Sequence, residues 1–286
     1  KYCNNTFSDD TLKFDGDGNK EPKGKIICKR ATTLHTEKCT QTDGSMFCSG
    51  AGYTTSGSKG TSTITYGNLG TTGSLNSGDA FDCDVNGDEI YDPETERFYY
   101  VSDYYNASTK LFEDDTAVLI YYNNVSSGNP NNNTKSSYDS SGENWHGPRT
   151  AITQLPTTSQ WNNVSLKNIS RTILNENSSN ITTGGTLPNK FSYEGYSSRL
   201  ITIQEVRKAA HNDNIPIWKV GELDDYNYFV ENTSFSSPNG RNLAYWLETP
   251  CSDSSSFAFG VYGHNRNVGS NDVPHLGVYS VRPAIE

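Results

Sequence analysis

The sequence contains no long apolar stretch and few basic residues. The most apolar run, at residues 117–122, is far shorter than the ~20 residues that a membrane-spanning helix needs. We therefore expect the protein to reach a membrane only through a tether outside this sequence. Lys and Arg together number 23 against 33 Asp and Glu, which gives a formal charge of −10. Nucleic-acid binding depends on clustered Lys and Arg, so this composition argues against a nucleic-acid partner.

The sequence also lacks a C-x-x-C pair. Its six cysteines occupy positions 3, 28, 39, 48, 83 and 251. Structural zinc sites usually take closely spaced Cys or Cys/His pairs, so the spacing favours disulfides in an oxidising compartment over free thiols. The connectivity stays open at this point, and the isolated Cys251 is a candidate for an unpaired thiol.

Common catalytic motifs are missing as well. H-E-x-x-H, G-x-S-x-G and the P-loop signature do not occur. The five histidines are scattered, and neighbouring carboxylates such as Asp114 and Asp115 are more typical of a solvated turn than of a facing acid and base. We therefore expect no catalytic residues and no enzymatic activity.

What is present indicates a β-rich chain. Hydrophobic residues make up 33% of the sequence, and Asn, Ser, Thr, Gly and Tyr dominate over helix-favouring types. Residues 1–78 are polar, rich in Gly, Thr and Ser, and contain four of the six cysteines, which predicts a small β-rich N-terminal region serving as stalk or anchor. From residue 79 onward the aromatic and β-branched runs at 97–101 and 117–122 predict strands of a larger domain, 79–286.

Two segments have the pattern of a helix N-terminus. In the capping box a Ser or Thr hydroxyl caps the N3 amide, and a Gln or Glu at N3 reaches back to the cap. Thr157 to Gln160 and Thr202 to Glu205 both fit this spacing. Two short helices among many short strands make the expected fold class α+β.

An acidic segment at 82–92 resembles a calcium loop. Calcium takes six to eight oxygen ligands, and alternating Asp and Asn residues supply such oxygens from one turn. Two registers are possible, starting at Asp82 or at Asp84, and each departs from the complete pattern: Glu89 stands where the second register needs Gly. An Asx-rich turn without metal is the alternative. The expected ligands of a Ca²⁺ ion are Asp82, Asp84, Asn86, Asp88 and Asp92.

Several segments of the larger domain resemble a known group of proteins. The segment at 199–206 is similar to the "R-L-P-T-x-x-E-W" helix start of formylglycine-generating-enzyme-type C-type-lectin folds. The segments at 245–250 and 281–285 resemble the "Y-W-L-R-S-P" and "G-V-R-P-A-I" motifs of surface proteins of gut Firmicutes. The resemblance, supported by 155–161 and 191–196, covers about residues 79–286. It implies a C-type-lectin-like fold with many short strands and two short helices.

Several proteins of this group are variable products of diversity-generating retroelements, in which mutated adenines rewrite Asn codons in a terminal repeat. Such mutation never produces Lys, Glu, Gln, Met or Trp, and none of these types occurs between Cys251 and Arg282. Ser280 departs from the Gly that the resembling sequences carry there. The resemblance thus implies a variable segment at 251–281, and the alternative is a polar hairpin region that lacks those types by chance.

The composition of this segment is typical of a recognition surface. Tyr, Ser, Gly and Asn dominate antibody paratopes because they combine rigid contact area with adaptable hydrogen bonds. We expect Val261, Val268, Val273 and Val281 to point inward and the intervening side chains to face solvent. The expected ligand-contacting residues are Asp253, Ser254, Ser256, Phe257, Phe259, Tyr262, His264, Asn265, Asn267, Ser270, Asn271, Asp272, His275 and Tyr279.

The sequence therefore predicts an extracellular, receptor- or adhesin-like binding protein on the bacterial cell surface. Its expected partner is a protein or glycan on another cell, a phage or a host surface. Two alternatives are a structural subunit of a surface layer or pilus, and a formylglycine-generating-type oxidase-like domain. The oxidase would need a reactive cysteine pair in the C-terminal half, where Cys251 stands alone.

Overall fold

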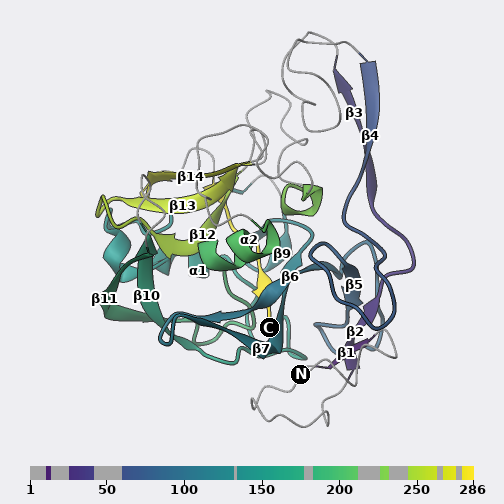
Figure 1. The fold of residues 1–286 in the computed structure, drawn as a ribbon, viewed down its shortest axis with the longest axis horizontal. Helices are drawn as coiled ribbons and strands as arrows, with labels where there is room; N and C mark the ends of the chain where they lie inside the picture. Colours follow the sequence, from purple (N-terminus) through teal and green to yellow (C-terminus); the bar gives the residue numbers. More distant parts are fainter. Residues whose placement is uncertain are drawn as a thin grey trace.

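The computed structural model describes residues 11–13, 26–41, 60–131, 134–176, 183–211, 226–231, 244–262, 267–274 and 279–286. This part of the chain is rich in strands and has only short helices (Figure 1). The α+β, strand-rich class predicted from the sequence is confirmed. Among the described residues, no helix has the length and apolar character needed to cross a bilayer.

The largest sheet has six strands in the order β1-β2-β5-β6-β7-β16, and all neighbours are antiparallel. The strands are β1 (Thr11–Lys13), β2 (Ile26–Arg30), β5 (Ala80–Cys83), β6 (Arg97–Asn106), β7 (Leu111–Tyr121) and β16 (Ala284–Ile285). The expected strands at 97–101 and 117–122 lie in β6 and β7, whose aromatic and β-branched side chains are buried from Phe98 to Tyr100 and from Ala117 to Tyr121.

The sheet brings parts of the predicted N-terminal region beside the predicted larger domain. Strand β2 pairs with β5, and Cys28 opposite Cys83 closes a disulfide between them. The disulfide expected from the cysteine spacing is therefore present for one pair. Paired strands and the Cys28–Cys83 disulfide thus connect the two sides of the predicted domain boundary at residue 78. The boundary itself stays a prediction.

A second sheet has four strands in the order β14-β13-β12-β15, with β15 parallel to β12. Its strands are β12 (Ala244–Pro250), β13 (Phe257–Tyr262), β14 (Asn267–Asp272) and β15 (Tyr279–Ser280). Three two-stranded pairs complete the strands. They are β3 (Thr36–Gln41) with β4 (Gly60–Thr65), β8 (Val125–Ser126) with β9 (Asn129–Pro130), and β10 (Ser170–Glu176) with β11 (Thr183–Ser192). The β3–β4 pair extends away from the rest of the protein in Figure 1.

One of the two predicted helix starts is confirmed. Helix α2 (Ile203–Ala209) begins after Thr202, whose hydroxyl accepts a hydrogen bond from the Glu205 amide while the Glu205 carboxylate accepts one from the Thr202 amide. The helix contacts β6 and β12 and so lies between the two sheets (Figure 1). The capping box fixes the helix where its apolar face meets the core.

The predicted helix at Thr157 is wrong. Gln160 does reach back to the Thr157 amide, at 2.9 Å, but residues 157–163 form turns. The apolar spacing that would carry a helix onward is missing there, because Asn162 and Asn163 follow Trp161. The other helical segments are α1 (Arg149–Ile152) and the short 3-10 helices η3 (Asn144–His146) and η4 (Asn227–Phe229).

The core holds charged side chains as well as apolar ones. Arg199 is fully buried and bonds to Glu205 at 2.7 Å and to Glu286 at 2.6 Å. Arg282, also fully buried, donates to the backbone carbonyls of Tyr121, Phe229 and Tyr228. Its donors tie β7 and the η4 turn to the C-terminal segment.

Candidate functional sites

The apolar scaffold expected for the 251–281 segment is present. Val261 pairs with Val268 across strands β13 and β14, and these two side chains together with Val273 and Val281 are at most 1% exposed. Cys251, at the end of β12, is a buried free thiol as expected. Burial raises the pKa of this thiol to about 12.

Three residues of the expected contact surface are buried, so the prediction that they face solvent is wrong. Phe259 and Tyr279 are fully buried, and Asn267 is 5% exposed. The Tyr279 ring stacks on Trp246 at 3.9 Å between centroids, with 13° between planes. Gly260 makes room for that ring: a Cβ at this position would overlap Tyr279 and stand 2.7 Å from the Tyr245 carbonyl oxygen. Strand β13 is a central strand buried on both faces, so alternation does not expose every second side chain.

The remaining residues form a smaller surface along the hairpin of β13 and β14. Phe257 is 36% exposed, Asp253 and Asp272 are exposed, and five others are half-buried: Ser254, Ser256, Tyr262, Ser270 and Asn271. His264, Asn265 and His275 lie outside the described residues. We call the eight described residues the hairpin surface.

Asn144 anchors one edge of the hairpin surface. This side chain is 2% exposed, and its amide nitrogen lies 2.8 Å from the Cys251 carbonyl and 2.6 Å from the carbonyls of Ser254 and Phe257. Its backbone amide donates to the Ser255 carbonyl at 2.6 Å. The next residue, Trp145, is 37% exposed. The sequence analysis missed Trp145, because nothing in the local sequence indicates that residue 144 bonds to residues 251–257.

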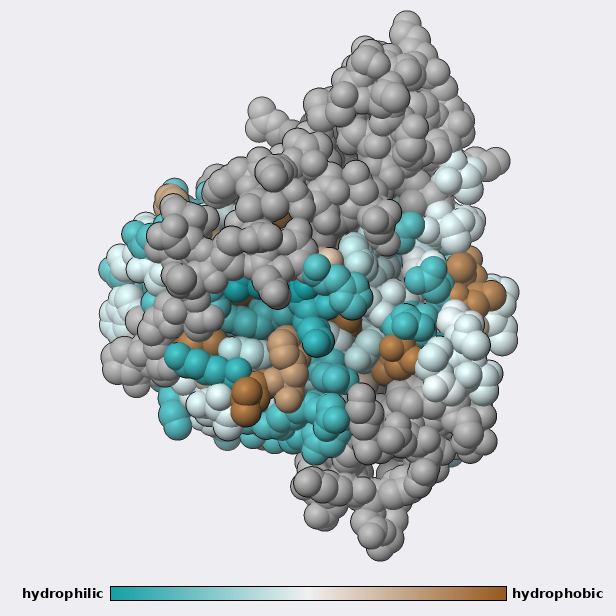
Figure 2. Space-filling view, in the orientation of Figure 1, coloured by the Kyte–Doolittle hydropathy of each residue, from teal (hydrophilic) through white to brown (hydrophobic). Residues whose placement is uncertain are grey.

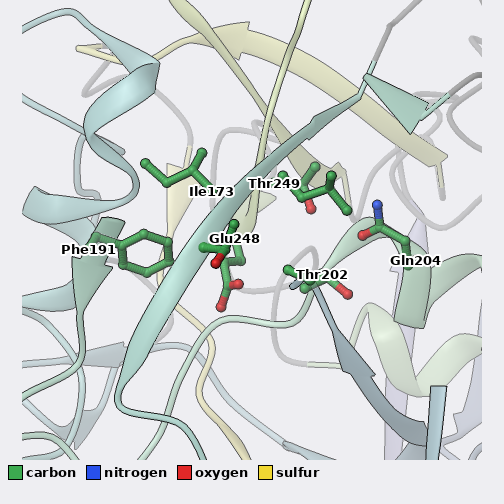
Figure 3. A pocket seen from close by; sticks show the side chains of 9 residues that line it. Ile173, Phe191, Thr202, Gln204, Glu248 and Thr249 are labelled. Atoms are coloured by element: carbon green, nitrogen blue, oxygen red, sulfur yellow. The ribbon is translucent and has the colours of Figure 1, made fainter. Parts of the chain in front are cut away.

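Three cavities border the β10–β11 pair. An internal one of about 10 Å³, the size of a single water, adjoins Glu248 (Figure 3). The Glu248 carboxylate accepts hydrogen bonds from Arg171 and Tyr193, so its polar atoms are already partnered. An open groove of about 360 Å³ is lined by Arg149, Ile152, Ser170, Lys190, Phe191 and Ser192. A third cavity, of about 90 Å³, lies beside β10 and is lined in part by Tyr104, Asn168 and Arg171. Of these three cavities, the groove has the most room for an organic ligand.

Figure 2 shows one face of the protein, in the orientation of Figure 1. The described residues on this face are mainly hydrophilic, and the hydrophobic ones form small separate spots. This agrees with the few exposed large hydrophobic side chains, which include Ile90 and Leu111 as well as Trp145 and Phe257. A large apolar interface is therefore not visible on the described part of this face.

The acidic loop between β5 and β6 forms the second candidate site. Carboxylate oxygens of Asp84, Asp88 and Glu96 all lie within 4.8 Å of one another, a grouping that could hold a metal ion. Asp84 and Asp88 belong to the set expected from the sequence. Asp84 is fully buried and Asp88 is exposed, so the cluster lies at the edge of the protein with one side open to solvent.

The other residues expected as metal ligands make different bonds. Asp82 accepts a hydrogen bond from Arg97 at 2.7 Å in a buried ion pair. Asp92 accepts hydrogen bonds from the Glu94 amide and the Thr95 hydroxyl within its own turn. The hydrogen bond from the Glu94 amide lowers the pKa of Asp92. Asn86 bonds to Asp88 through both ends of its side-chain amide. The structure therefore gathers two of the five expected ligands, Asp84 and Asp88, in the carboxylate cluster. Asp82 and Asp92 are not part of it, and Asn86 lies beside it, bonded to Asp88.

Glu96 is the member of the cluster that sequence reasoning missed. It is 4% exposed. Its Oε2 accepts a hydrogen bond from the Asp92 amide at 3.2 Å, whereas its buried Oε1 has no hydrogen-bond partner. Burial, together with the nearby carboxylates of Asp88 and Asp84, raises the pKa of Glu96 to about 7 against the lowering effect of the hydrogen bond from the Asp92 amide. The two possible registers of the calcium-loop motif end at residues 93 and 95 and so do not include Glu96.

Hydrogen bonds and close packing hold the acidic loop against the turn at 161–163. The Asn163 side chain donates to the Asp84 backbone carbonyl at 2.6 Å and to its carboxylate at 3.2 Å, and the Asn163 amide donates to the Val85 carbonyl. Gly87 takes a φ of +80°, as the expected sharp turn requires. A Cβ there would stand 2.7 Å from Oδ1 of Asn162. The loop is therefore fitted closely to the turn at 161–163.

Comparison with protein-family models, with curated proteins and with solved structures returns no match for this chain. The functional argument therefore depends on the two sites themselves.

Proposed function

We propose that this protein is an extracellular binding protein with a C-type-lectin-like fold, which contacts its ligand through the hairpin surface. The observation that carries the proposal is the separation of roles in β13 and β14. Valine side chains fill the core beneath, while polar and aromatic side chains of a paratope-like composition stand half-buried or exposed above them. Substitutions at the exposed positions can then change recognition without removing core contacts.

Two further features support an extracellular location. The Cys28–Cys83 disulfide joins adjacent strands, and disulfides persist mainly in oxidising compartments. The sequence resemblance to variable surface proteins of gut Firmicutes supports display on a bacterial cell surface. The absence of Lys, Glu, Gln, Met and Trp between Cys251 and Arg282 supports a retroelement-diversified segment, and the proposed partner is a protein or glycan on another cell, a phage or a host.

Binding of labelled protein to a glycan array and to panels of bacterial and epithelial cells tests this function. The variants Phe257→Ser, Tyr262→Ser and Asp272→Ser should stay folded and lose or change the binding pattern. Leu111→Ser, which alters a 64% exposed residue of β7, is the matched control and should bind as the wild type does.

Three results would speak against the proposal. Binding unaltered in all three variants places recognition elsewhere, with the groove beside Arg149 and Lys190 as the next surface to alter. Unfolding of the variants assigns these side chains to the core. Self-association lost in the same variants would support the structural-subunit alternative instead.

We also propose Ca²⁺ as the ion of the acidic loop. Carboxylate oxygens are hard ligands that suit Ca²⁺ or Mg²⁺ better than zinc or copper. Ca²⁺ accepts irregular geometry and six to eight ligands, whereas Mg²⁺ demands a nearly ideal octahedron. Parallel calorimetric titrations with Ca²⁺ and Mg²⁺ test this choice, and tighter binding of Mg²⁺ would reject it.

A further inference from the structure

The Glu96 carboxylate lies in an environment that calls for a cation. Glu96 is 4% exposed, yet its Oε1 has no hydrogen-bond partner. Carboxylate oxygens of Asp84 and Asp88 lie within 4.8 Å of an oxygen of the Glu96 carboxylate. An unpartnered buried polar atom costs about 1–3 kcal/mol, and more when the group is charged. The loop nevertheless gathers the Glu96 carboxylate with those of Asp84 and Asp88 and supplies no hydrogen-bond donor to Oε1.

The spacing of the three carboxylates fits one ion. Calcium binds oxygen at about 2.3–2.6 Å, so two ligands on opposite sides of the ion are at most about 5 Å apart. The cluster oxygens all lie within 4.8 Å of one another. One ion between them would contact the Glu96 carboxylate, and the exposed side at Asp88 leaves space for water ligands.

Backbone and side-chain donors already hold two of the three carboxylates in place. Asp84 accepts from the Gly87 amide at 2.7 Å and the Glu89 amide at 3.2 Å, and Asp88 accepts from the Ile90 amide at 2.8 Å. Outer contacts of this kind orient metal ligands and strengthen binding. Asn163 adds a bond from the neighbouring turn to Asp84.

We propose that Asp84, Asp88 and Glu96 bind one divalent cation, and that this ion has a structural role, fastening the β5–β6 loop to the turn at 161–163. This inference depends on the proposed Ca²⁺ only for the identity of the ion. The site adjoins Cys83 and its disulfide at the end of β5, and Figure 1 shows β5 on the opposite side of the protein from β13 and β14. An ion here stabilises the sheet from a distance and does not touch a ligand on the hairpin surface.

Calorimetric titration of the full chain with CaCl₂, after removal of metals with EDTA, tests the ligand set. Glu96→Gln and Asp88→Asn should each weaken Ca²⁺ binding by about tenfold or more, because charge count sets calcium affinity. Glu94→Gln removes the same charge from an exposed position of the same loop and is the matched control, with less than about a threefold change expected from its longer-range effect. Asp88 is exposed, so its variant should fold whatever the fate of Glu96→Gln.

The structural role is tested by thermal melting and by ligand binding in the same samples. Ca²⁺ should raise the Tm of wild type and of Glu94→Gln, and this rise should shrink in Glu96→Gln and Asp88→Asn. Removing Ca²⁺ below the melting range should leave the array or cell-binding pattern unchanged.

Each contrary outcome identifies what fails. Ca²⁺ affinity retained in Glu96→Gln, or lost equally in Glu94→Gln, overturns the ligand set. Binding of Mg²⁺ alone with the same variant pattern keeps the ligand set and rejects only the choice of ion. Absence of any divalent binding rejects the site while leaving the hairpin surface untouched, and loss of ligand binding on calcium removal in folded protein rejects the structural role.

Discussion

Glu205 and Glu286 lie in the core on either side of Arg199, whereas Glu96 lies in the core beside two further carboxylates. In the first region the protein supplies the countercharge itself: Arg199 donates to both glutamates. Burial alone would raise the pKa of Glu205, but Arg199 lowers it below its ordinary value. In the second region burial raises the pKa of Glu96 to about 7. The fold thus supplies its own countercharge at one place, whereas at the other the countercharge is the divalent cation that we propose.

The largest effect is expected from removing the buried positive charge of Arg199. Arg199→Met leaves Glu205 and Glu286 buried without their partner, which should lower the free energy of unfolding by about 3–5 kcal/mol. Urea denaturation at pH 7 measures this loss. Arg149→Met, at an exposed position, is the control and should stay within about 0.5 kcal/mol of the wild type.

If Arg199→Met does not fold at pH 7, its recovery on acidification keeps the prediction testable. Protonation of the unpaired glutamates should then restore part of the structure near pH 4–5, as followed by circular dichroism. A cost below about 1 kcal/mol at pH 7 would show that the Arg199 network is a minor contributor, since the median for exposed pairs is about that size.

The next effect separates the two regions by pH. The folded pKa of Glu96 is raised from 4.5 to about 7, so its contribution to stability is fully present below about pH 4.5 and is lost as the pH rises through 7. The metal-free protein should therefore lose about 1–3 kcal/mol over this interval relative to Glu96→Gln. Glu205 has a lowered pKa and acts in the opposite sense: its contribution is present at neutral pH and is lost as the pH falls below its unfolded value.

Urea denaturation in EDTA at several pH values between 5 and 8 measures the Glu96 effect. Burial would lower the pKa of His35, but its hydrogen bond with Glu231 raises it overall, so His35 titrates in the same direction within this interval. The difference between wild type and Glu96→Gln isolates Glu96, and Glu94→Gln should follow the wild type. Parallel pH profiles for all three proteins would show that Glu96 titrates normally.

The sequence predicted the elements whose signals are local. The aromatic and β-branched runs in β6 and β7 indicate strands by themselves, and the Thr202–Glu205 capping box is complete within four residues. The inward position of Val261 and Val268 was predicted correctly because β13 and β14 pair in simple register. These features need no knowledge of distant segments.

The features that were missed depend on tertiary contacts. Phe259 and Tyr279 are buried because β13 is covered on both faces, and only Gly260 hints at the Tyr279 ring packed against it. Glu96 joins the cluster because the pairing of β5 with β6 brings the end of the loop back to its start, with Asp82 opposite Arg97. The same pairing takes Asp82 away as a ligand, since Arg97 bonds to it.

A smaller effect tests directly whether Glu96, and not Asp82, is a ligand of the ion. Asp82→Asn removes the buried charge partner of Arg97 and should lower the free energy of unfolding by about 1–3 kcal/mol. Its Ca²⁺ affinity should stay near that of the wild type, because Asp82 lies outside the cluster. Calorimetric titration beside Asp88→Asn decides the matter: equal losses of affinity in the two variants would restore Asp82 to the ligand set.

The smallest effect concerns the backbone of the acidic loop. Glu89 has a φ of +65°, a left-handed conformation in which a side chain costs roughly 1–2 kcal/mol and Gly is unstrained. Glu89→Gly should therefore raise the free energy of unfolding by up to about 1 kcal/mol once the greater freedom of Gly in the unfolded chain is subtracted. The Glu89 amide, which donates to Asp84, remains available in the variant.

Charge and strain are separated by a second substitution at the same position. Glu89→Ala removes the charge but keeps a Cβ in the left-handed conformation, so the Gly variant should exceed the Ala variant by about 1 kcal/mol in the metal-free protein. Lys110→Gly, at a φ of +59° in the turn between β6 and β7, should show a similar gain far from any carboxylate cluster. Because neither change alters Asp84, Asp88 or Glu96, Ca²⁺ should raise the Tm of both glycine variants by as much as it raises that of the wild type. An Ala variant as stable as the Gly variant would assign any gain at residue 89 to relief of charge repulsion and not to the backbone.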